Sequence, residues 1–411
     1  MASTGTAPLT PARTTYRDVL AEPRFRVIFA TRVLAITADS LRISTFSVLV
    51  YATTSSPLLS GIAFGAGFLP QAFGATLLGS LADRLPPRGL ITAGYLLECA
   101  TALLLALAAL PIAVSLVLIA LIAFLTPVFG GAANALVARS LTGDAYVLGR
   151  SLNNMASSAA QLAGLGLSGA AVSLLGARHA LLAGAALYAV AACRIRLALP
   201  RLPAQGPTAS PASPVRASLA ATAALLRARR PRRLLLAQWL PGACVAGAEG
   251  QIVAYAGSQG FASGGYAVLM ACLPVGMLVG DVLVGRMLRP ATRERLVAPL
   301  MALMGLPLLL FAARPGLAAG ALLLLLAGVG FAYGLGLQRP FLDALPADAH
   351  GHAFGLLGSG TMTLQGVAPA LFGALALPFG PPLAMSLAGA ATVLTVPLSR
   401  RGPTRVPRRA A

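Results

Sequence analysis

The sequence has no lysine and few charged residues of any kind. Only 11 of its 411 residues are acidic and charged residues make up 10% of the chain, whereas 57% of the residues are hydrophobic. A water-soluble domain carries far more charge on its surface than this composition supplies. The scarcity of charge therefore excludes an ordinary soluble protein and predicts an integral membrane protein surrounded by the lipid bilayer.

Because lysine is absent, all 31 basic residues are arginine, and the net charge is +20. Nucleic-acid binding would require these arginines to gather on one face of a soluble fold. They lie instead between apolar segments. Together with the excess of Ala, Leu and Gly they indicate a GC-rich coding bias, and we expect no nucleic-acid partner.

Cysteine is also rare. Cys99, Cys193, Cys244 and Cys272 all fall inside apolar segments, without a CxxC pair or a histidine nearby in sequence. This pattern favours small residues in the core or facing lipid over a metal site or a disulfide framework. We expect no metal and no cofactor.

Two further motifs are missing. The sequence has no GxxxxGK[ST] phosphate-binding loop, so ATP-driven work would need another subunit. The acidic residues are scattered and form no DDxxD cluster of the kind that a membrane lipid transferase would use to bind metal. We therefore expect no enzyme, and an ion gradient is the simpler source of energy.

Long apolar stretches are the dominant feature that is present. A helical span needs about 20 predominantly apolar residues, and no short signal-peptide pattern precedes the first long stretch. We predict an all-α integral membrane protein with twelve transmembrane helices, at roughly 25–52, 57–82, 89–110, 112–138, 151–175, 177–199, 233–257, 264–288, 295–313, 315–338, 353–378 and 380–399.

The arginines are distributed unevenly between these segments. The two tails and every second connection are arginine-rich, whereas the alternate connections hold only Arg178 and Arg314. Cytoplasmic loops carry the excess of basic residues in membrane proteins. We expect a multi-pass protein of the cell inner (plasma) membrane, with the tails 1–24 and 400–411 both cytoplasmic.

A Pro-, Ala- and Ser-rich stretch at 200–232 separates two sets of six segments, 25–199 and 233–399. Part of this cytoplasmic linker, 219–230, would either lie as an amphipathic helix on the anionic inner leaflet or remain a solvated basic loop. Several residues recur at an offset of 204: Leu69-Pro70 and Leu273-Pro274, Gln161 and Gln365, Gly169-Ala170 and Gly373-Ala374, Gly176 and Gly380. The two sets therefore resemble duplicated bundles of the same topology.

Such parallel repeats are typical of rocker-type secondary transporters, whose binding site lies near the membrane midplane between the halves. The matched prolines, Pro70 and Pro274, are expected to break or bend the second and eighth segments.

Three charged residues interrupt the first apolar segment: Arg32, Asp39 and Arg42. Charges at this depth are costly and are usually functional. An unpaired Asp39 would take up a proton rather than remain charged, and Arg32 and Arg42 lie near the same helix face. We expect Asp39 to titrate during transport; the alternative is a permanent structural pair of Asp39 and Arg42.

Other polar residues occur within spans. Glu98, Glu249 and Gln251 would each face the central cavity, where they attract a cationic or hydroxyl-bearing substrate or share the proton with Asp39. For Glu98, a structural hydrogen bond between helices is the competing interpretation.

The run Gly79-Ser-Leu-Ala-Asp83-Arg84 with Arg88 resembles the loop motif between helices 2 and 3 of the major facilitator superfamily. The longer stretch from Phe25, FRVIFATRVLAITADSLRISTFSVLVYATTSSPLLSG, is similar to its drug-exporter branch, the macrolide-efflux and enterobactin-exporter-like proteins. The chain departs from that branch in four places. Tyr95 and Glu98 replace an Asp and an Arg, and the stretch 164–169 lacks the antiporter proline. The stretch 112–137 lacks an arginine, and His350 and His352 stand where a basic pair often precedes helix 11.

The resemblance implies two pseudo-symmetric six-helix bundles and a cytoplasmic gate formed by Gly79, Asp83, Arg84 and Arg88, with a tight turn as the alternative for these residues. It also implies proton-coupled efflux of small amphipathic compounds, such as antibiotics or secondary metabolites, by alternating access. Its partners would be a small-molecule substrate, protons and the lipid bilayer, and we expect a monomer. A proton-coupled importer of a small metabolite and a transport-inactive scaffold on the same fold are the alternatives.

Overall fold

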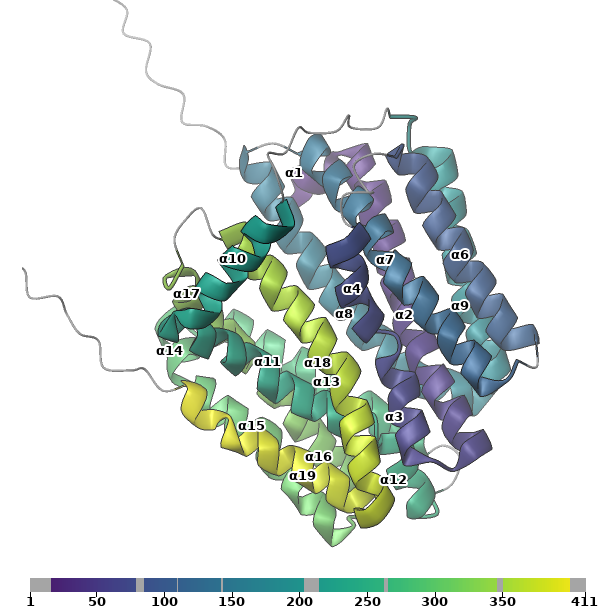
Figure 1. The fold of residues 1–411 in the computed structure, drawn as a ribbon, viewed down its shortest axis with the longest axis vertical. Helices are drawn as coiled ribbons and strands as arrows, with labels where there is room; N and C mark the ends of the chain where they lie inside the picture. Colours follow the sequence, from purple (N-terminus) through teal and green to yellow (C-terminus); the bar gives the residue numbers. More distant parts are fainter. Residues whose placement is uncertain are drawn as a thin grey trace, which may run out of the picture.

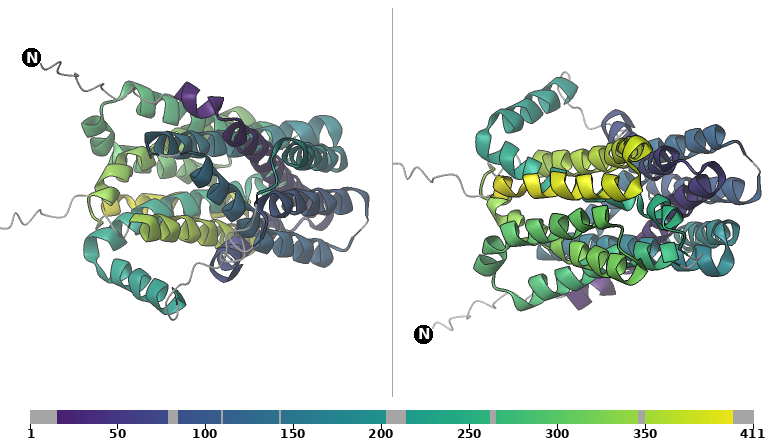
Figure 2. Two further views of the ribbon diagram at one scale, coloured as in Figure 1. Left: turned by 90° about the horizontal axis from the view of Figure 1, so that it is seen from above. Right: turned by 90° about the horizontal axis from the view of Figure 1, so that it is seen from below.

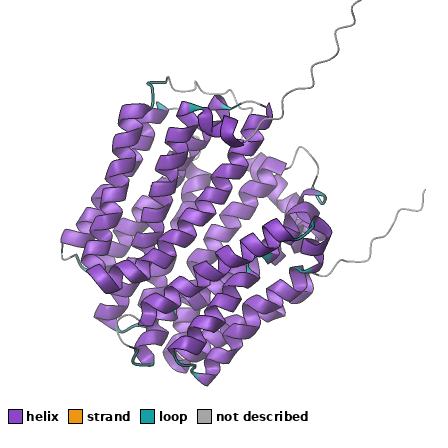
Figure 3. Ribbon diagram, turned by 180° about the vertical axis from the view of Figure 1, so that it is seen from behind, coloured by secondary structure: helices purple, strands orange, loops and turns teal. Residues whose placement is uncertain are grey.

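The computed structural model describes residues 16–78, 85–108, 110–141, 143–202, 214–261, 265–345 and 350–399. Regular structure in these residues is helical throughout, and none of them belongs to a strand (Figure 3). The predicted all-α fold is confirmed.

Residues up to 199 form the first half. Within the residues described, it consists of the short helix α1, five long helices and one interrupted helix, which is divided into α3 and α4. Proline at the first or second helical position, where no backbone N–H is needed, starts α2, α3 and α6. The helices are α1 (Tyr16–Ala21), α2 (Pro23–Thr54), α3 (Pro57–Gly65), α4 (Leu69–Leu78), α6 (Pro87–Leu107), α7 (Ile112–Ser140), α8 (Gly143–Leu175) and α9 (Ala177–Ala198).

The chain from residue 229 onward, the second half, is more often interrupted. Its helices are α11 (Arg229–Glu249), α12 (Ile252–Ser258), α13 (Gly265–Met287), α14 (Pro290–Arg295), α15 (Val297–Leu309), η1 (Leu310–Ala313), α16 (Leu317–Gly330), α17 (Tyr333–Leu342), α18 (His350–Phe379), α19 (Pro381–Leu394) and η3 (Val396–Ser399). Between the halves lies α10 (Pro214–Arg227).

Within the described ranges, nine helical stretches are long and apolar enough to cross a membrane. The predicted segments 151–175 and 295–313 contain the shorter apolar helices Ala159–Leu175 and Val297–Ala313. The predicted segment 233–257 is divided between α11 and α12. The apolar spans thus support a membrane protein, and the count of twelve stays a prediction.

The backbone conformation also repeats at one pair of positions that match in the sequence repeat. Gly176 and Gly380, which are 204 residues apart, both have φ +80°, with ψ 158° and 157°, and they cap the N-termini of α9 and α19. A positive φ is accessible to glycine because it has no Cβ. The matched prolines behave differently: the chain is interrupted between α3 and α4 beside Pro70, whereas α13 continues through Pro274. Pro274 therefore does not break its helix, and the bend that the sequence allows at Pro274 stays a prediction.

The halves lie side by side, with the purple-to-blue helices on one side and the green-to-yellow helices on the other (Figures 1 and 2). Contacts of α4 with α18 and of α12 with α2 and α3 join them, together with two larger helix pairs, α3 with α18 and α8 with α13. Each pair corresponds to the other at the 204-residue offset, so the junction between the halves repeats as well.

Glycine residues let the paired helices approach each other closely at these junctions. A Cβ on Gly61 or Gly65 of α3 would overlap the backbone of α18 at Pro369 or Gly366, and a Cβ on Gly169 of α8 would overlap Ala267 of α13. Small residues let membrane helices pack backbone to backbone. We call the contact of Gly61 and Gly65 with α18 the α3–α18 seam.

The linker region contains a helix that packs on the second half. Leu225 of α10 is buried in a cluster with Leu235, Phe341, Leu345 and Ala353. A helix therefore forms over much of this stretch, but its apolar face meets α11 and α18 rather than the inner leaflet that the sequence suggested.

The close approach of α4 to α7 yields a testable prediction. A methyl group at Gly74 would overlap the carbonyl group of Phe124, whereas one at Gly358 of α18 would meet no atom within 4 Å. Overpacking typically costs about 1–3 kcal/mol, so Gly74→Ala should lower the melting temperature of the detergent-purified protein. Gly358→Ala is the matched control and should not lower it; equal melting temperatures for the two variants would contradict the packing.

Candidate functional site

Arg42 lies at the centre of a buried charged network. Its guanidinium forms an ion pair with Asp39, three residues earlier on α2, and a second with Glu98 of α6, at 3.1 Å between Nη2 and Oε2. The three charged side chains therefore join two helices of the first half. Asp39 is paired with Arg42, as one of the two interpretations of the sequence has it.

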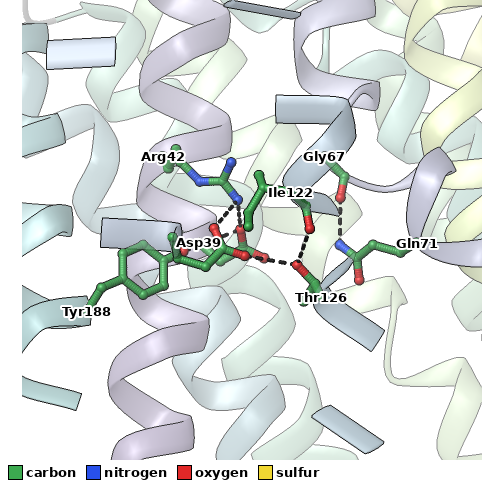
Figure 4. Close-up of polar contacts among 8 residues, drawn as sticks. Asp39, Arg42, Gly67, Gln71, Ile122, Thr126 and Tyr188 are labelled. Carbon is green, nitrogen blue, oxygen red and sulfur yellow. Dashed lines mark hydrogen bonds and ion pairs between the residues drawn. The ribbon is translucent and has the colours of Figure 1, made fainter. Parts of the chain in front are cut away.

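Two neutral side chains complete this network (Figure 4). Thr126 of α7 donates its hydroxyl hydrogen bond to Glu98 Oε1 at 2.9 Å and lies 2.9 Å from the Ile122 carbonyl oxygen. The hydroxyl of Tyr188 on α9 lies 3.5 Å from Asp39 Oδ1. Side chains from α2, α6, α7 and α9 thus converge on one point. We call these five residues the Arg42 network: Asp39, Arg42, Glu98, Thr126 and Tyr188.

The members of the Arg42 network differ in exposure. The side chains of Arg42 and Glu98 are 2% and 6% exposed, whereas that of Asp39 is 27% exposed. Arg42 Nε and Nη1 are buried without a hydrogen-bond partner among the described residues. Asp39 is therefore the charged member that a proton or a transported molecule can reach most directly.

The charges of the network do not cancel. When both carboxylates are ionised they face a single guanidinium, and the formal charge is −1; one added proton makes the group neutral. Burial disfavours an uncompensated charge. The arrangement can therefore take up and release one proton without exposing a second buried charge.

Arg32 does not join the Arg42 network. It lies on α2 seven residues before Asp39, about 10 Å along the helix at the rise of an α-helix. Its Nε donates to Ser157 Oγ of α8 at 3.4 Å, and its Nη1 donates to Asn134 Oδ1 of α7 at 3.2 Å. The structure thus separates Arg32 from Asp39 and Arg42 on the same helix.

Glu249 and Gln251 lie in the second half, where α11 ends and α12 begins. Gln251 is buried, and its Nε2 lies 3.4 Å from the Pro369 carbonyl oxygen of α18, while its Oε1 has no hydrogen-bond partner in the described chain. Within the described residues, Glu249 forms no hydrogen bond or ion pair. Neither residue contacts the Arg42 network.

Of the predicted gate, the described chain includes only Arg88. Its guanidinium donates to the Arg196 carbonyl oxygen in the last turn of α9. A cation in that position stabilises the negative end of a helix, so Arg88 ties the start of α6 to the end of α9. Gly79, Asp83 and Arg84 lie outside the described residues.

Sequence reasoning missed four residues of these sites: Thr126, Tyr188, Asn134 and Ser157. Each is a neutral polar residue in a long apolar helix, and such residues are common enough to give no signal alone. The spacing of Thr126 and Asn134 on α7, eight residues apart with Gly130 between them, places all three on one side of the helix. That pattern becomes informative once α7 is known to lie beside α2.

No group of three or more His, Cys, Asp or Glu residues in the described ranges could hold a metal ion. The charged side chains that do cluster, Asp39, Arg42 and Glu98, form ion pairs with one another.

Comparison with known proteins identifies the family of this chain. The family model of the Major Facilitator Superfamily matches residues 28–342. No curated protein sequence matches the chain.

Solved structures with the same fold include three transporters. The human organic anion transporter MFSD10 (TETRAN) is 18% identical with a TM-score of 0.63, covering 92% of this chain and 99% of its own. A mutant of the nucleoside transporter NupG is 14% identical with a TM-score of 0.65, covering 91% and 98%. A POT family transporter in complex with 5-aminolevulinic acid is 11% identical with a TM-score of 0.70, covering 90% and 94%.

At these identities the three structures establish a shared fold and not a shared substrate. The family model, by contrast, spans most of the chain. The chain therefore belongs to the Major Facilitator Superfamily, and it is a membrane transporter rather than an enzyme.

Proposed function

We propose that this protein is a proton-coupled secondary transporter that exports small amphipathic compounds, such as antibiotics or secondary metabolites, by alternating access. The observation that carries the proposal is the Arg42 network, in which two carboxylates share one buried guanidinium. A proton-coupled carrier needs a group that is protonated in one state and ionised in another, and two carboxylates opposite one buried guanidinium would supply such a group.

Asp39 is the proton acceptor in this proposal. It is the most exposed charged member of the network, and it pairs with the same arginine as Glu98. Protonation of Asp39 leaves Arg42 paired with Glu98, so no buried charge is stranded. In this proposal the Asp39–Arg42 pair is not permanent, because Arg42 keeps Glu98 as its partner when Asp39 is protonated.

Alternating access is supported by where the halves meet. Tyr51, near the end of α2, donates to the Ala254 carbonyl oxygen of α12 at 3.2 Å, and Gly61 and Gly65 pack on α18. Figure 1 places α3 and α12 together, far from α1 and α10. By the positive-inside bias, α1 and α10 mark the cytoplasmic end. We infer that the outer end is closed in this conformation and that the bundles 25–199 and 233–399 rock about the linker 200–232.

The substrate class rests on the resemblance of the first segment to drug exporters and on the apolar character of the spans. The similar structures carry titles that name an organic anion transporter, a nucleoside transporter and a peptide-binding POT family member. One fold thus serves different substrates, and substrate choice depends on individual side chains. A monomer in the plasma membrane, with both tails cytoplasmic, completes the proposal.

Removing one carboxylate tests the coupling. Asp39→Asn or Glu98→Gln leaves a single carboxylate opposite Arg42, so the network no longer needs a proton for neutrality. A drug-susceptibility panel in an efflux-deficient host should show protection by the wild type and loss of protection by Asp39→Asn. For a compound found in that panel, proton release from energised everted vesicles should fall about tenfold or more, a difference of about 1.4 kcal/mol.

Asp281→Asn is the control for these variants, because Asp281 is an exposed carboxylate on α13. It should behave as the wild type. Full proton-dependent efflux by both Asp39→Asn and Glu98→Gln would rule out the network as the coupling site. In the same vesicles, movement of compound and proton in one direction would favour the importer, and absence of any flux would favour the scaffold.

A bulky side chain placed in the α3–α18 seam tests alternating access. The Cβ of Gly65→Val would overlap the Gly366 backbone, so the variant should shift the population toward a state that is open at this end. Spin labels at Ala52→Cys and Ser258→Cys, placed in a background without the four native cysteines, should then show a longer distance distribution by pulsed electron paramagnetic resonance. Gly358→Val, whose site is open, should leave the distribution unchanged; an unchanged distribution in Gly65→Val as well would contradict the seam as a gate.

A further inference from the structure

Arg32 is a guanidinium at membrane depth without a carboxylate. The described residues provide it with two hydrogen-bond acceptors, Asn134 Oδ1 and Ser157 Oγ, and both are neutral. Among the described residues, Arg32 forms no ion pair. An uncompensated charge within a membrane span is costly and marks a functional position by default.

The hydrogen bonds of Arg32 are also incomplete. A guanidinium has five N–H donors in a planar fork that suits two oxygen atoms of one anion. Arg32 uses two donors, at 3.4 and 3.2 Å, the long end of the normal range. Its side chain is partly exposed, and its Nη2 has no hydrogen-bond partner among the described residues.

The space beside Arg32 is open. Asn134 is exposed although it lies inside the long helix α7, and Gly130, one turn earlier on the same side, has no atom within 4 Å of where a Cβ would stand. Thr126, one further turn along, belongs to the Arg42 network. The same side of α7 thus leads from Arg32 to the proton-binding carboxylates.

We propose that Arg32, with Asn134 and Ser157, binds an anionic group of the transported molecule: a carboxylate, sulfonate or phosphate on an otherwise apolar compound. This site rests on the proposed transport function and specifies its substrate class. The anion supplies the charge and the acceptors that Arg32 lacks, while the apolar part of the molecule lies against the apolar spans. Arg32 is therefore a binding residue, distinct from the Arg42 network that carries the proton.

The binding site is compatible with export or import, and the vesicle measurement described above gives the direction. The identity of the bound charge is tested separately, by equilibrium binding without a proton gradient.

The test uses the full-length protein in nanodiscs of phosphatidylcholine and two sets of probes. The sets are built on a naphthalene and an octyl frame, each with a carboxylate, a carboxamide or a methylammonium group. We expect the carboxylate of at least one frame to bind about tenfold more tightly than its amide and ammonium counterparts, a preference typical of a charge-assisted hydrogen bond. If neither carboxylate is preferred, the proposal is overturned.

Two variants assign that preference to Arg32. Arg32→Gln should abolish it, and Asn134→Asp should abolish it as well, because the new carboxylate would occupy the guanidinium from within the protein. Asp39→Asn should retain the preference while losing proton coupling, so failure of the anion site and failure of the proton site give different results. Retention of the preference in both Arg32→Gln and Asn134→Asp would overturn the assignment.

Thermal stability separates a binding role from a structural one. Without ligand, Arg32→Gln removes an uncompensated charge and should not lower the melting temperature, and Asn134→Asp should raise it. Arg293→Gln is the contrasting control, because Arg293 donates to the carbonyl oxygens of Leu288 and Gly285; it should lower the melting temperature and leave the anion preference intact. A large destabilisation by Arg32→Gln would mean that Arg32 is structural.

An anionic lipid headgroup has the same chemistry as the proposed ligand. Binding of the carboxylate probe is therefore repeated in nanodiscs that contain phosphatidylglycerol. Unchanged binding supports a transported anion. Competition by the lipid, lost in Arg32→Gln, would assign the site to a headgroup and overturn the substrate assignment.

Discussion

The pairing of two carboxylates with the single buried guanidinium of Arg42 is the constraint on which the first half depends. A guanidinium that is 2% exposed inside an apolar bundle must be neutralised there. Asp39 is supplied by the same helix, but Glu98 comes from α6, and Thr126 and Tyr188 bring α7 and α9 to the same point. The network therefore fixes how four helices pack and, in the same place, holds a charge that one proton can change.

The second half does not repeat this chemistry although it repeats the fold. The residues 204 positions after Asp39, Arg42 and Glu98 are Ala243, Ala246 and Ala302. The polar residues Glu249 and Gln251 instead lie at the break between α11 and α12. The charges that carry the proposed coupling therefore belong to one bundle.

The two halves meet backbone to backbone at several glycines, in addition to side-chain contacts such as that of Tyr51 with Ala254. Glycines on α3 and α18, and Gly169 against Ala267, bring helix axes close enough that a Cβ would overlap the neighbour. Such contacts contain few interlocking side chains, and they are well suited to an interface that separates and forms again during transport. Because glycine has no side chain, the helices approach closely at these positions, and few interlocked side chains would oppose their separation.

Much of the fold was determined by the sequence itself. Apolar length predicts the helices, the 204-residue repeat predicts two related bundles, and charge at membrane depth identifies Asp39, Arg42, Arg32 and Glu98 as candidates, because the cost of burying a charge is a property of the residue and its span. Local sequence did not decide which charges meet. Arg32 and Arg42 lie on one helix with similar surroundings in sequence, but Arg42 faces Glu98, whereas Arg32 faces Asn134 and Ser157. Only the tertiary structure makes that choice, because pairing depends on which helices lie opposite each turn of α2.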